Sequence, residues 1–249
     1  MKNKFTKPAL AVGSVIFWII LWHLGAAAVN KRLMLKIPLP AETFSAFFDN
    51  CGNIQFWQTV LISVLHILTG FLFAVIIGIA GGILSHRFFI FRSLSAPLLH
   101  LTRTVPVAAF IILAWLWIPS GILPSFISFI MVLPIIWSHT DAGLKATDEK
   151  LIEAARVFGM SKTDIIFRVR LPLMSPQLRA GCITGLGIAW KAGVAAEVIS
   201  SPTGSLGAML SSAKSGINYE QVFAVTLAVV LLSLFFENLL KLVWREQKR

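Results

Sequence analysis

The sequence predicts an all-α integral membrane protein: a bundle of six transmembrane helices with a short helical hairpin on its cytoplasmic side. Three observations lead to this prediction. Charged residues make up only 13% of the 249 residues, about half the share found in soluble domains. Six apolar windows follow one another along the chain. Lys and Arg gather in alternate connecting segments. Much of the surface is therefore expected to face lipid.

Each apolar window is close to the roughly 20 residues that a helix needs to cross about 30 Å of hydrocarbon. The first follows three lysines and ends in Ala26-Ala27-Ala28, like a signal peptide, but its apolar run is longer than that of a cleaved signal, so an uncleaved span is favoured. The short turn 119–121 makes the third and fourth windows an antiparallel pair. The windows are 9–29, 58–84, 98–118, 122–140, 177–199 and 221–243.

The distribution of Lys and Arg predicts the orientation of the bundle. With the N-terminus inside, the inner segments hold seventeen of these residues and the outer segments only four, Lys31, Arg32, Lys36 and Lys214. Positive residues favour the cytoplasmic side, so both ends are expected there. The net charge of +11 is then explained by the inner membrane surface and requires no nucleic acid.

The longest inner connection, 141–175, carries the features of two capped helices. Thr147 or Asp148 can cap the first helix, and Gly159 supplies the left-handed residue expected just after its end. Ser161 and Asp164 have the spacing of a capping box, with Asp in place of Glu or Gln. Pro172 is expected to end the second helix. The pattern predicts a rigid hairpin at the membrane surface.

Three interpretations of this hairpin compete. It can be a surface loop folded for its own stability. It can be a DNA-binding helix-turn-helix, but isoleucines stand where base-reading side chains belong, and both ends are held near lipid. It can be a docking element, since apolar side chains flanked by arginines suit a groove on a soluble partner.

The docking interpretation is supported by a resemblance. Glu153-Ala154-Ala155, then Gly159, then Val169-Arg170-Leu171-Pro172 resembles the EAA motif of ABC importer permeases, with Val169 in place of isoleucine. The stretches LPLPAETFSAF, PLLHLTRTVPVAAFIILAWLW, DAGLKATDEKLIEAARVFG and AWKAGVAAEVIS resemble the nitrate, sulfonate and taurine branch. The chain departs from that branch at His66, where arginine is frequent, and at Pro119-Ser120, where tryptophan and a hydrophobic residue usually precede glycine.

The resemblance implies an ABC type-1 transmembrane domain. It divides the chain into an N-terminal anchor and external segment (1–56), a core (57–243) with the coupling loop 141–175, and a cytoplasmic tail (244–249). It also implies two ATP-binding subunits, a second permease chain and an external binding protein as partners. The residues expected to dock an ATPase subunit are Glu153, Ala154, Ala155, Val157, Phe158, Gly159, Ser161, Asp164, Ile165, Ile166, Leu171 and Pro172.

The fifth span is the best candidate lining of a transport path, because it is rich in small residues. Gly181 with Gly185, and Ala189 with Gly193, stand four apart, as Gly78 and Gly82 do in the second span. This spacing allows close helix packing.

Charged and aromatic residues in the spans supply the candidates for that path. Lys191 can face a path and meet an anion, or it can meet backbone carbonyls or another span. Glu197, six residues on, lies about 240° around the helix from Lys191, which makes a direct pair unexpected. Trp190, His66 and Arg103 are further candidates, with packing, a hydrogen bond within the bundle and a headgroup contact as the respective alternatives.

No enzyme motif is found in the sequence, and the two cysteines, Cys51 and Cys182, show no metal spacing. We expect no catalytic residue, metal or cofactor in this chain, with ATP and Mg²⁺ bound by the partner ATPases. The expected function is that of a permease subunit in a bacterial inner-membrane importer. Its expected cargo is a small solute, such as a sulfonate, taurine or nitrate. An ion-coupled transporter without an ATPase is the alternative, but it would normally show acidic residues at mid-depth.

Overall fold

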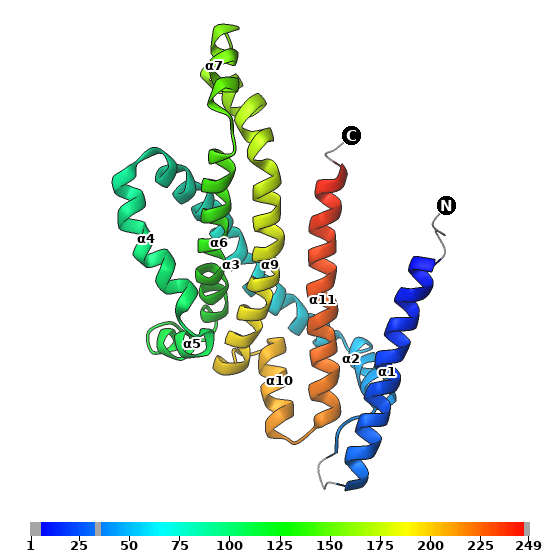
Figure 1. Ribbon diagram of the computed structural model, residues 1–249. Coiled ribbons are helices and arrows are strands. Elements are labelled where there is room, and N and C mark those ends of the chain that lie inside the picture. The colour runs from blue at the N-terminus through cyan, green and yellow to red at the C-terminus, as the bar shows by residue number, and fades with distance from the viewer. Residues whose placement is uncertain (1–5, 33–35, 247–249) are drawn as a thin grey trace.

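The computed structural model of the chain describes the backbone of residues 6–32 and 36–246. Every regular element in this part is a helix (Figure 1). The elements are α1 (Thr6–Arg32), α2 (Pro40–Cys51), α3 (Ile54–Arg87), α4 (Phe89–Thr104), α5 (Val107–Trp115), α6 (Leu123–Lys145), α7 (Glu149–Val157), α8 (Lys162–Asp164), the π-helical segment η1 (Ile165–Arg170), α9 (Leu171–Ser200), α10 (Leu206–Ser215) and α11 (Tyr219–Glu246).

Among the described residues, five helical runs are long and apolar enough to cross a membrane. They correspond to five of the six windows expected from the sequence, and α4 with α5 supplies the sixth if this bent pair is one span. The start of α1 and the end of α11 point to the side on which α7 projects (Figure 1). The fold is therefore that of a helical membrane bundle, as expected.

The third window, 98–118, is not the straight helix that the sequence analysis expected. α4 and α5 meet at an angle of 101°, and Val105, between them, is extended at φ −70° and ψ 130°. The cause is Pro106, which lacks an N–H and keeps the residue before it out of the helical region. The turn that follows α5 reaches Ile122 before α6 begins.

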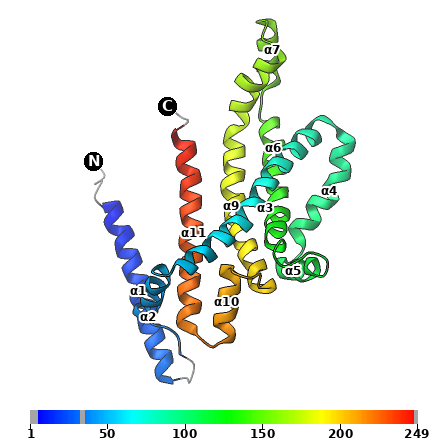
Figure 2. The same cartoon turned by 180° about the vertical axis from the view of Figure 1, so that it is seen from behind.

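The centre of the bundle is formed by α3, α6 and α9, with α11 against one side. Ile67, Val132, Ile136 and Ala189 are wholly buried in its largest apolar cluster. Figure 2, the view from behind, shows α3 running obliquely in front of α9. The crossing brings the middle of α3 against α6, so the second and fourth spans share the tightest part of the core.

Small residues let these backbones approach closely, as their four-residue spacing predicts. A Cβ placed at Gly78 would lie 2.8 Å from Cβ of Ile136, and one at Gly82 would lie 2.5 Å from Cβ of Thr140. A Cβ at Gly181 would lie 2.8 Å from Cβ of His139. The packing role of these glycines is confirmed.

At the end of the bundle opposite the hairpin, the helices are joined by polar contacts. Nζ of Lys36 lies 2.7 Å from Oε1 of Glu220 and 3.2 Å from Oε1 of Glu42. These carboxylates raise the pKa of Lys36, while a hydrogen bond from the N–H of Leu39 lowers the pKa of Glu42. The contacts fix the start of α2 beside the start of α11.

Pro172 does not end the second helix of the hairpin, which corrects the expectation from the sequence. Lys162 to Ser200 is one uninterrupted helical run of 39 residues. The π-helical segment η1 directly precedes Leu171, and Pro172 sits at the first turn of α9. Proline is tolerated at a first turn, and the wider π-helical ring has changed the hydrogen-bond pattern just before it. The hairpin is thus continuous with the fifth span.

Candidate docking hairpin and transport path

The first helix of the hairpin (residues 149–172) has well-formed caps at both ends. Asp148, one of the two residues expected there, accepts a hydrogen bond from the N–H of Lys150 at 2.9 Å. At the other end, Gly159 has φ +76°. The N–H of Gly159 bonds the carbonyl of Arg156, and the N–H of Met160 bonds that of Ala155. This is the Schellman arrangement, which satisfies carbonyls left free at a helix end.

The second helix begins at Ser161, as the capping-box spacing predicts. Oγ of Ser161 accepts from the N–H of Asp164 at 3.1 Å and donates to Oδ2 of Asp164 at 2.6 Å. The reciprocal bond therefore joins two side chains, because the shorter Asp reaches the hydroxyl in place of the backbone N–H. Arg168 also contacts Asp164, at 3.1 Å. These local bonds fix the angle at which the chain turns.

The hairpin has its own small core and an exposed apolar end. Ile152, Ala155 and Ile165 are buried against one another, with Met160 and Val169 beside them. Two of the expected docking residues, Ala155 and Ile165, therefore lie inside the hairpin. Most of the others are exposed and Asp164 is half-buried. The residues at the end, Val157 and Phe158, are 85% and 86% exposed.

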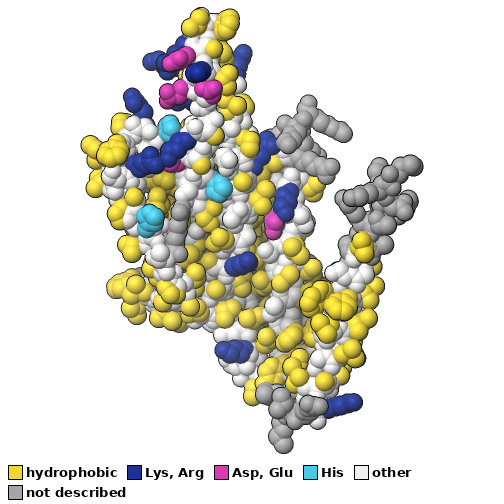
Figure 3. Space-filling view, viewed as in Figure 1, with side chains coloured by type: hydrophobic (Ala, Val, Ile, Leu, Met, Phe, Trp, Pro, Cys, Tyr) yellow, Lys and Arg dark blue, Asp and Glu magenta, His cyan; other side chains and the backbone are white. Residues whose placement is uncertain are grey.

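Two further exposed apolar residues of the hairpin were missed by the sequence analysis. Leu151 and Phe167 are 51% and 63% exposed. Phe167 directly follows Ile165-Ile166, so the apolar run itself was the available signal. Figure 3 shows Lys, Arg, Asp and Glu gathered around the end of the molecule that carries α7, while the middle of this face is mainly apolar. An apolar end among charged residues is typical of a surface that a partner covers.

A cluster of charges lies next to the hairpin, at the end of α6 that leads into it, and it too was missed. Oδ2 of Asp141 lies 2.6 Å from Nζ of Lys145 and 3.9 Å from the guanidinium of Arg92 in α4, and Oδ1 lies 3.6 Å from Nδ1 of His86 in α3. A cavity of about 260 Å³ opens beside Asp141 between α4 and α6, and it is lined in part by Arg92 and Lys145. The carboxylate thus connects three helices close to where the hairpin begins.

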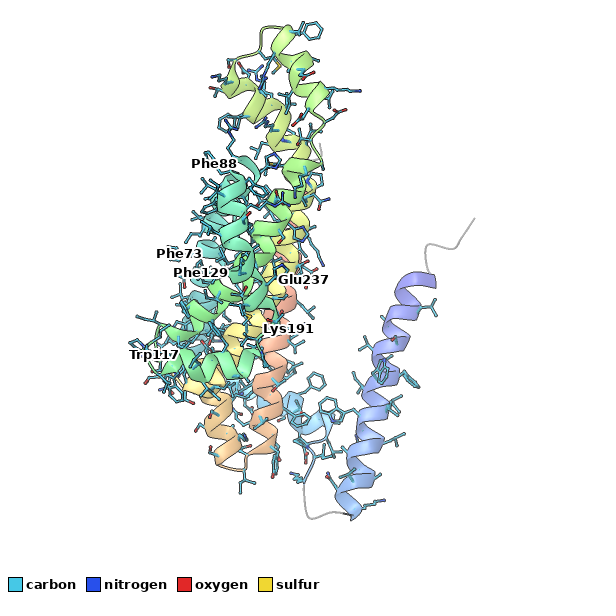
Figure 4. The ribbon with its side chains drawn as sticks, turned by 60° about the vertical axis from the view of Figure 1, so that its left-hand side comes forward. Phe73, Phe88, Trp117, Phe129, Lys191 and Glu237 are labelled. Atoms are coloured by element: carbon cyan, nitrogen blue, oxygen red, sulfur yellow. The ribbon has the colours of Figure 1, made fainter. Side chains whose placement is uncertain are left out.

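In the fifth span, Lys191 is exposed at the surface of the chain (Figure 4). It lies on one side of α9 with Thr184 and Ala180, which are also exposed, and next to Gly187, where an added Cβ would meet nothing within 4 Å. Among the described residues it makes no ion pair, and none joins it to Glu197, as the angle between them predicts. A charge on a lipid-facing surface at this depth costs at least about 2.5 kcal/mol. This side of α9 is therefore expected to face water or another chain.

Trp190 points the other way. It is 2% exposed, its Nε1 donates a hydrogen bond to the carbonyl of Val229 at 2.9 Å, and its ring lies 5.5 Å from that of Phe236. Trp190 therefore joins α9 to α11, which favours its packing alternative over that of path lining. The side chain of Arg103 lies outside the described residues.

Glu197 and His66 are brought together, although they were singled out on different spans. Oε1 of Glu197 lies 2.8 Å from Nδ1 of His66, Oε2 accepts from Oγ of Ser63 at 2.7 Å, and Oε2 also accepts from the N–H of Gly207 at 3.1 Å. Glu197 is wholly buried. An ionised carboxylate only accepts hydrogen bonds, so His66 donates from Nδ1. In this structure the carboxylate is held inside the chain, while the ring of His66 stays 18% exposed.

These features together define a class: a helical membrane-embedded subunit with a capped hairpin and an exposed apolar end on one side. The chain matches the family described as binding-protein-dependent transport system inner membrane component over residues 70–249. It is 30% identical over 255 residues to a putative ABC transporter permease protein of Methanocaldococcus jannaschii, covering 99% of this chain and 93% of that protein. The chain belongs to this family and is an ABC transporter permease subunit.

Two relatives carry names that state a solute. The taurine transport system permease protein of Escherichia coli K12 is 26% identical over 235 residues, which cover 92% of this chain and 84% of that protein. The glycine betaine/proline betaine transport system permease protein of the same organism is 25% identical over 238 residues, which cover 95% of this chain and 64% of that protein. The two identities are nearly equal, so they do not separate one branch from the other. The family implies ATP-binding subunits and a substrate-binding protein as partners.

Proposed function

We propose that this chain is the permease of an importer in which two separate ATPase subunits dock on the hairpin and drive alternating access. The observation that supports this most directly is the exposed pair Val157 and Phe158, held at the end of a capped and internally packed hairpin. A partner protein that covers them is favoured, because moving two apolar side chains, each about 85% exposed, out of water lowers the free energy.

The rigidity of the hairpin fits this role. Its core of Ile152, Ala155 and Ile165 packs the two helices together, and its second helix continues into α9 without a break. A displacement of the hairpin is therefore passed to the fifth span and is not absorbed in a flexible loop. We place the hairpin and both chain ends on the cytoplasmic side of the bacterial inner membrane, in line with the excess of Lys and Arg there.

The cargo path is proposed to run along the exposed side of α9 that carries Lys191, between this chain and a second permease chain. Six spans are few for a complete path, and this side of α9 leaves open space at Gly187. An ammonium group beside a water-filled path favours a negatively charged solute. We propose a small anion or a zwitterion with an acidic group, such as a sulfonate, taurine or nitrate, delivered by an external binding protein.

Co-purification tests the docking proposal. The chain is expressed with an ABC ATPase subunit from the same organism and purified in detergent by a tag on the permease. We expect the wild-type chain to retain the ATPase, and the double variant Val157→Ser, Phe158→Ser to lose it. Lys162→Ala is the matched control, because this residue is also exposed on the hairpin but is polar. Retention of the ATPase by the double variant at the wild-type level would disprove docking through this end of the hairpin.

A further inference from the structure

The buried carboxylate of Glu197 lies where α9 ends and the chain turns back into α10. Ser201 closes α9 in a left-handed conformation, and Gly204, at φ +76°, shapes the turn. Three donors converge on the carboxylate: the hydroxyl of Ser63 and the ring of His66, both from α3, and the N–H of Gly207 from α10. One side chain of α9 thus contacts two other helices, α3 and α10.

The first turn of α10 depends on these contacts. The N–H of Leu206 donates to Oγ of Ser63 at 2.8 Å, and the N–H of Gly207 donates to Glu197 at 3.1 Å. Only the third N–H, that of Ala208, is satisfied from within the turn, by Oγ of Ser205. The free N–H groups at a helix start carry partial positive charge, which a carboxylate stabilises. α10 is therefore attached to α3 and α9 through its own backbone.

Close packing reinforces this attachment. A Cβ at Gly207 would overlap Cβ of Glu197, so α10 lies directly against the last turn of α9. Leu206 is wholly buried in a cluster with Phe56 and Val60 of α3 and with Val225 and Ala228 of α11. The carboxylate thus lies at the centre of a block formed by the outer ends of α3, α9 and α11, with α10 between them.

The place of Glu197 along the helical run explains why this block matters. From Lys162 in the hairpin to Glu197 the chain is one helical run, which at 1.5 Å per residue spans roughly 50 Å. The hairpin lies at one end of this run. At the other end, the carboxylate of Glu197 is hydrogen-bonded to α10 and α3. Figure 1 shows α7 and α10 at opposite ends of α9.

We propose that Glu197 is a positioning residue for transport, which locks α10 and α3 to the far end of α9. This proposal rests on the proposed function, because the displacement that it transmits enters at the docking hairpin. When the contacts of Glu197 are intact, a movement of the hairpin shifts the far ends of α9, α10 and α3 together. Without these contacts, α9 moves and α10 does not follow it. ATP hydrolysis then no longer depends on whether the external binding protein is bound at that end of the bundle.

Glutamine in place of Glu197 is the sharpest change, because it keeps the shape of the side chain. Its NH2 group can only donate: facing Ser63 and Gly207 it loses at least one hydrogen bond, and facing His66 it keeps one only when the ring accepts at Nδ1 in its other tautomer. The negative charge is lost in both cases. Glu220→Gln is the matched control, since this carboxylate lies at the same end of the bundle but pairs with Lys36 at the surface. Ser63→Ala leaves the carboxylate in place but removes one of its donors together with the acceptor of the Leu206 N–H.

Two measurements on the reconstituted complex of permease, ATPase and binding protein test the proposal. The first is the ratio of ATP hydrolysis with and without the binding protein. We expect Glu197→Gln to bring this ratio close to one, Ser63→Ala to lower it part of the way, and Glu220→Gln to leave it unchanged. A loss of folded complex alone would lower both rates together and leave the ratio intact.

The second measurement is hydrogen exchange of the peptides that cover residues 201–215. We expect exchange in the first turn of α10 to become about tenfold faster in Glu197→Gln, as loss of a hydrogen bond to a charged group implies, while the hairpin peptides keep their wild-type rates. Wild-type values of both the ratio and the exchange in Glu197→Gln would overturn the proposal. If that variant fails to assemble, the hydrolysis ratio in Ser63→Ala decides it, because exchange in Ser63→Ala also reflects the lost acceptor of the Leu206 N–H. If ATP hydrolysis by the wild-type complex is the same with and without the binding protein, the proposed function fails. The exchange measurement still tests whether Glu197 holds the start of α10.

Discussion

Glu197 and His66 are 131 residues apart in the sequence, and their side chains meet at 2.8 Å inside the bundle. Each was a candidate for the transport path when considered alone. Their pairing joins α9 to α3, while Lys191 is a charged group of the fifth span that stays exposed. The division of roles among these residues follows from packing, and it directs the predictions below.

Gly159→Val should weaken docking of the ATPase. At φ +76° a residue with a Cβ pays about 1–2 kcal/mol, and a β-branched residue pays more, although no atom lies within 4 Å of the added Cβ. Asn tolerates this conformation and is the control. Co-purification should therefore fall for Gly159→Val and stay near the wild-type level for Gly159→Asn. Equal retention by both variants would show that the conformation at the turn does not limit docking.

Lys191→Met should lower transport while assembly with the ATPase is preserved. Loss of a charged contact to an anionic solute corresponds to about a tenfold effect or more. Uptake into proteoliposomes is measured with the solute that shifts the melting temperature of the binding protein. Lys214→Met, at an exposed position of α10, serves as the control for loss of one positive charge. Undiminished uptake in Lys191→Met would remove Lys191 from the path.

Gly82→Ala should destabilise the bundle where α3 crosses α6. The added Cβ would lie 2.5 Å from Cβ of Thr140 and 2.9 Å from the carbonyl oxygen of Trp137. Overpacking of this kind costs about 1–3 kcal/mol, so thermal unfolding in detergent should occur several degrees lower. In Gly25→Ala the added Cβ meets nothing within 4 Å, and its melting temperature should match the wild type. Identical melting of the two variants would contradict the close approach of these helices.

A large part of the fold could be predicted because the interactions that decide it are local. A run of about 20 apolar residues leaves water whatever surrounds it, and a cap bonds N–H groups two or three residues away. The caps of the hairpin at Asp148 and Ser161 and the turn at Gly159 follow from such short-range rules, as do the glycine pairs that bring α3 and α6 together. The bend at Pro106 is equally local, and its proline was the signal that the hydropathy window concealed.

The sequence by itself determined where the spans lie, which connection folds into the hairpin, and which residues are candidates for function. Only the tertiary structure decided how those candidates are used: that Ile165 turns into the hairpin core, that Trp190 faces α11, and that Glu197 and Ser63 hold the start of α10. The physical reason is that a side chain's partners across helices depend on crossing angles and rotations, which are set by packing among all the helices together. Hydropathy and spacing describe one helix at a time.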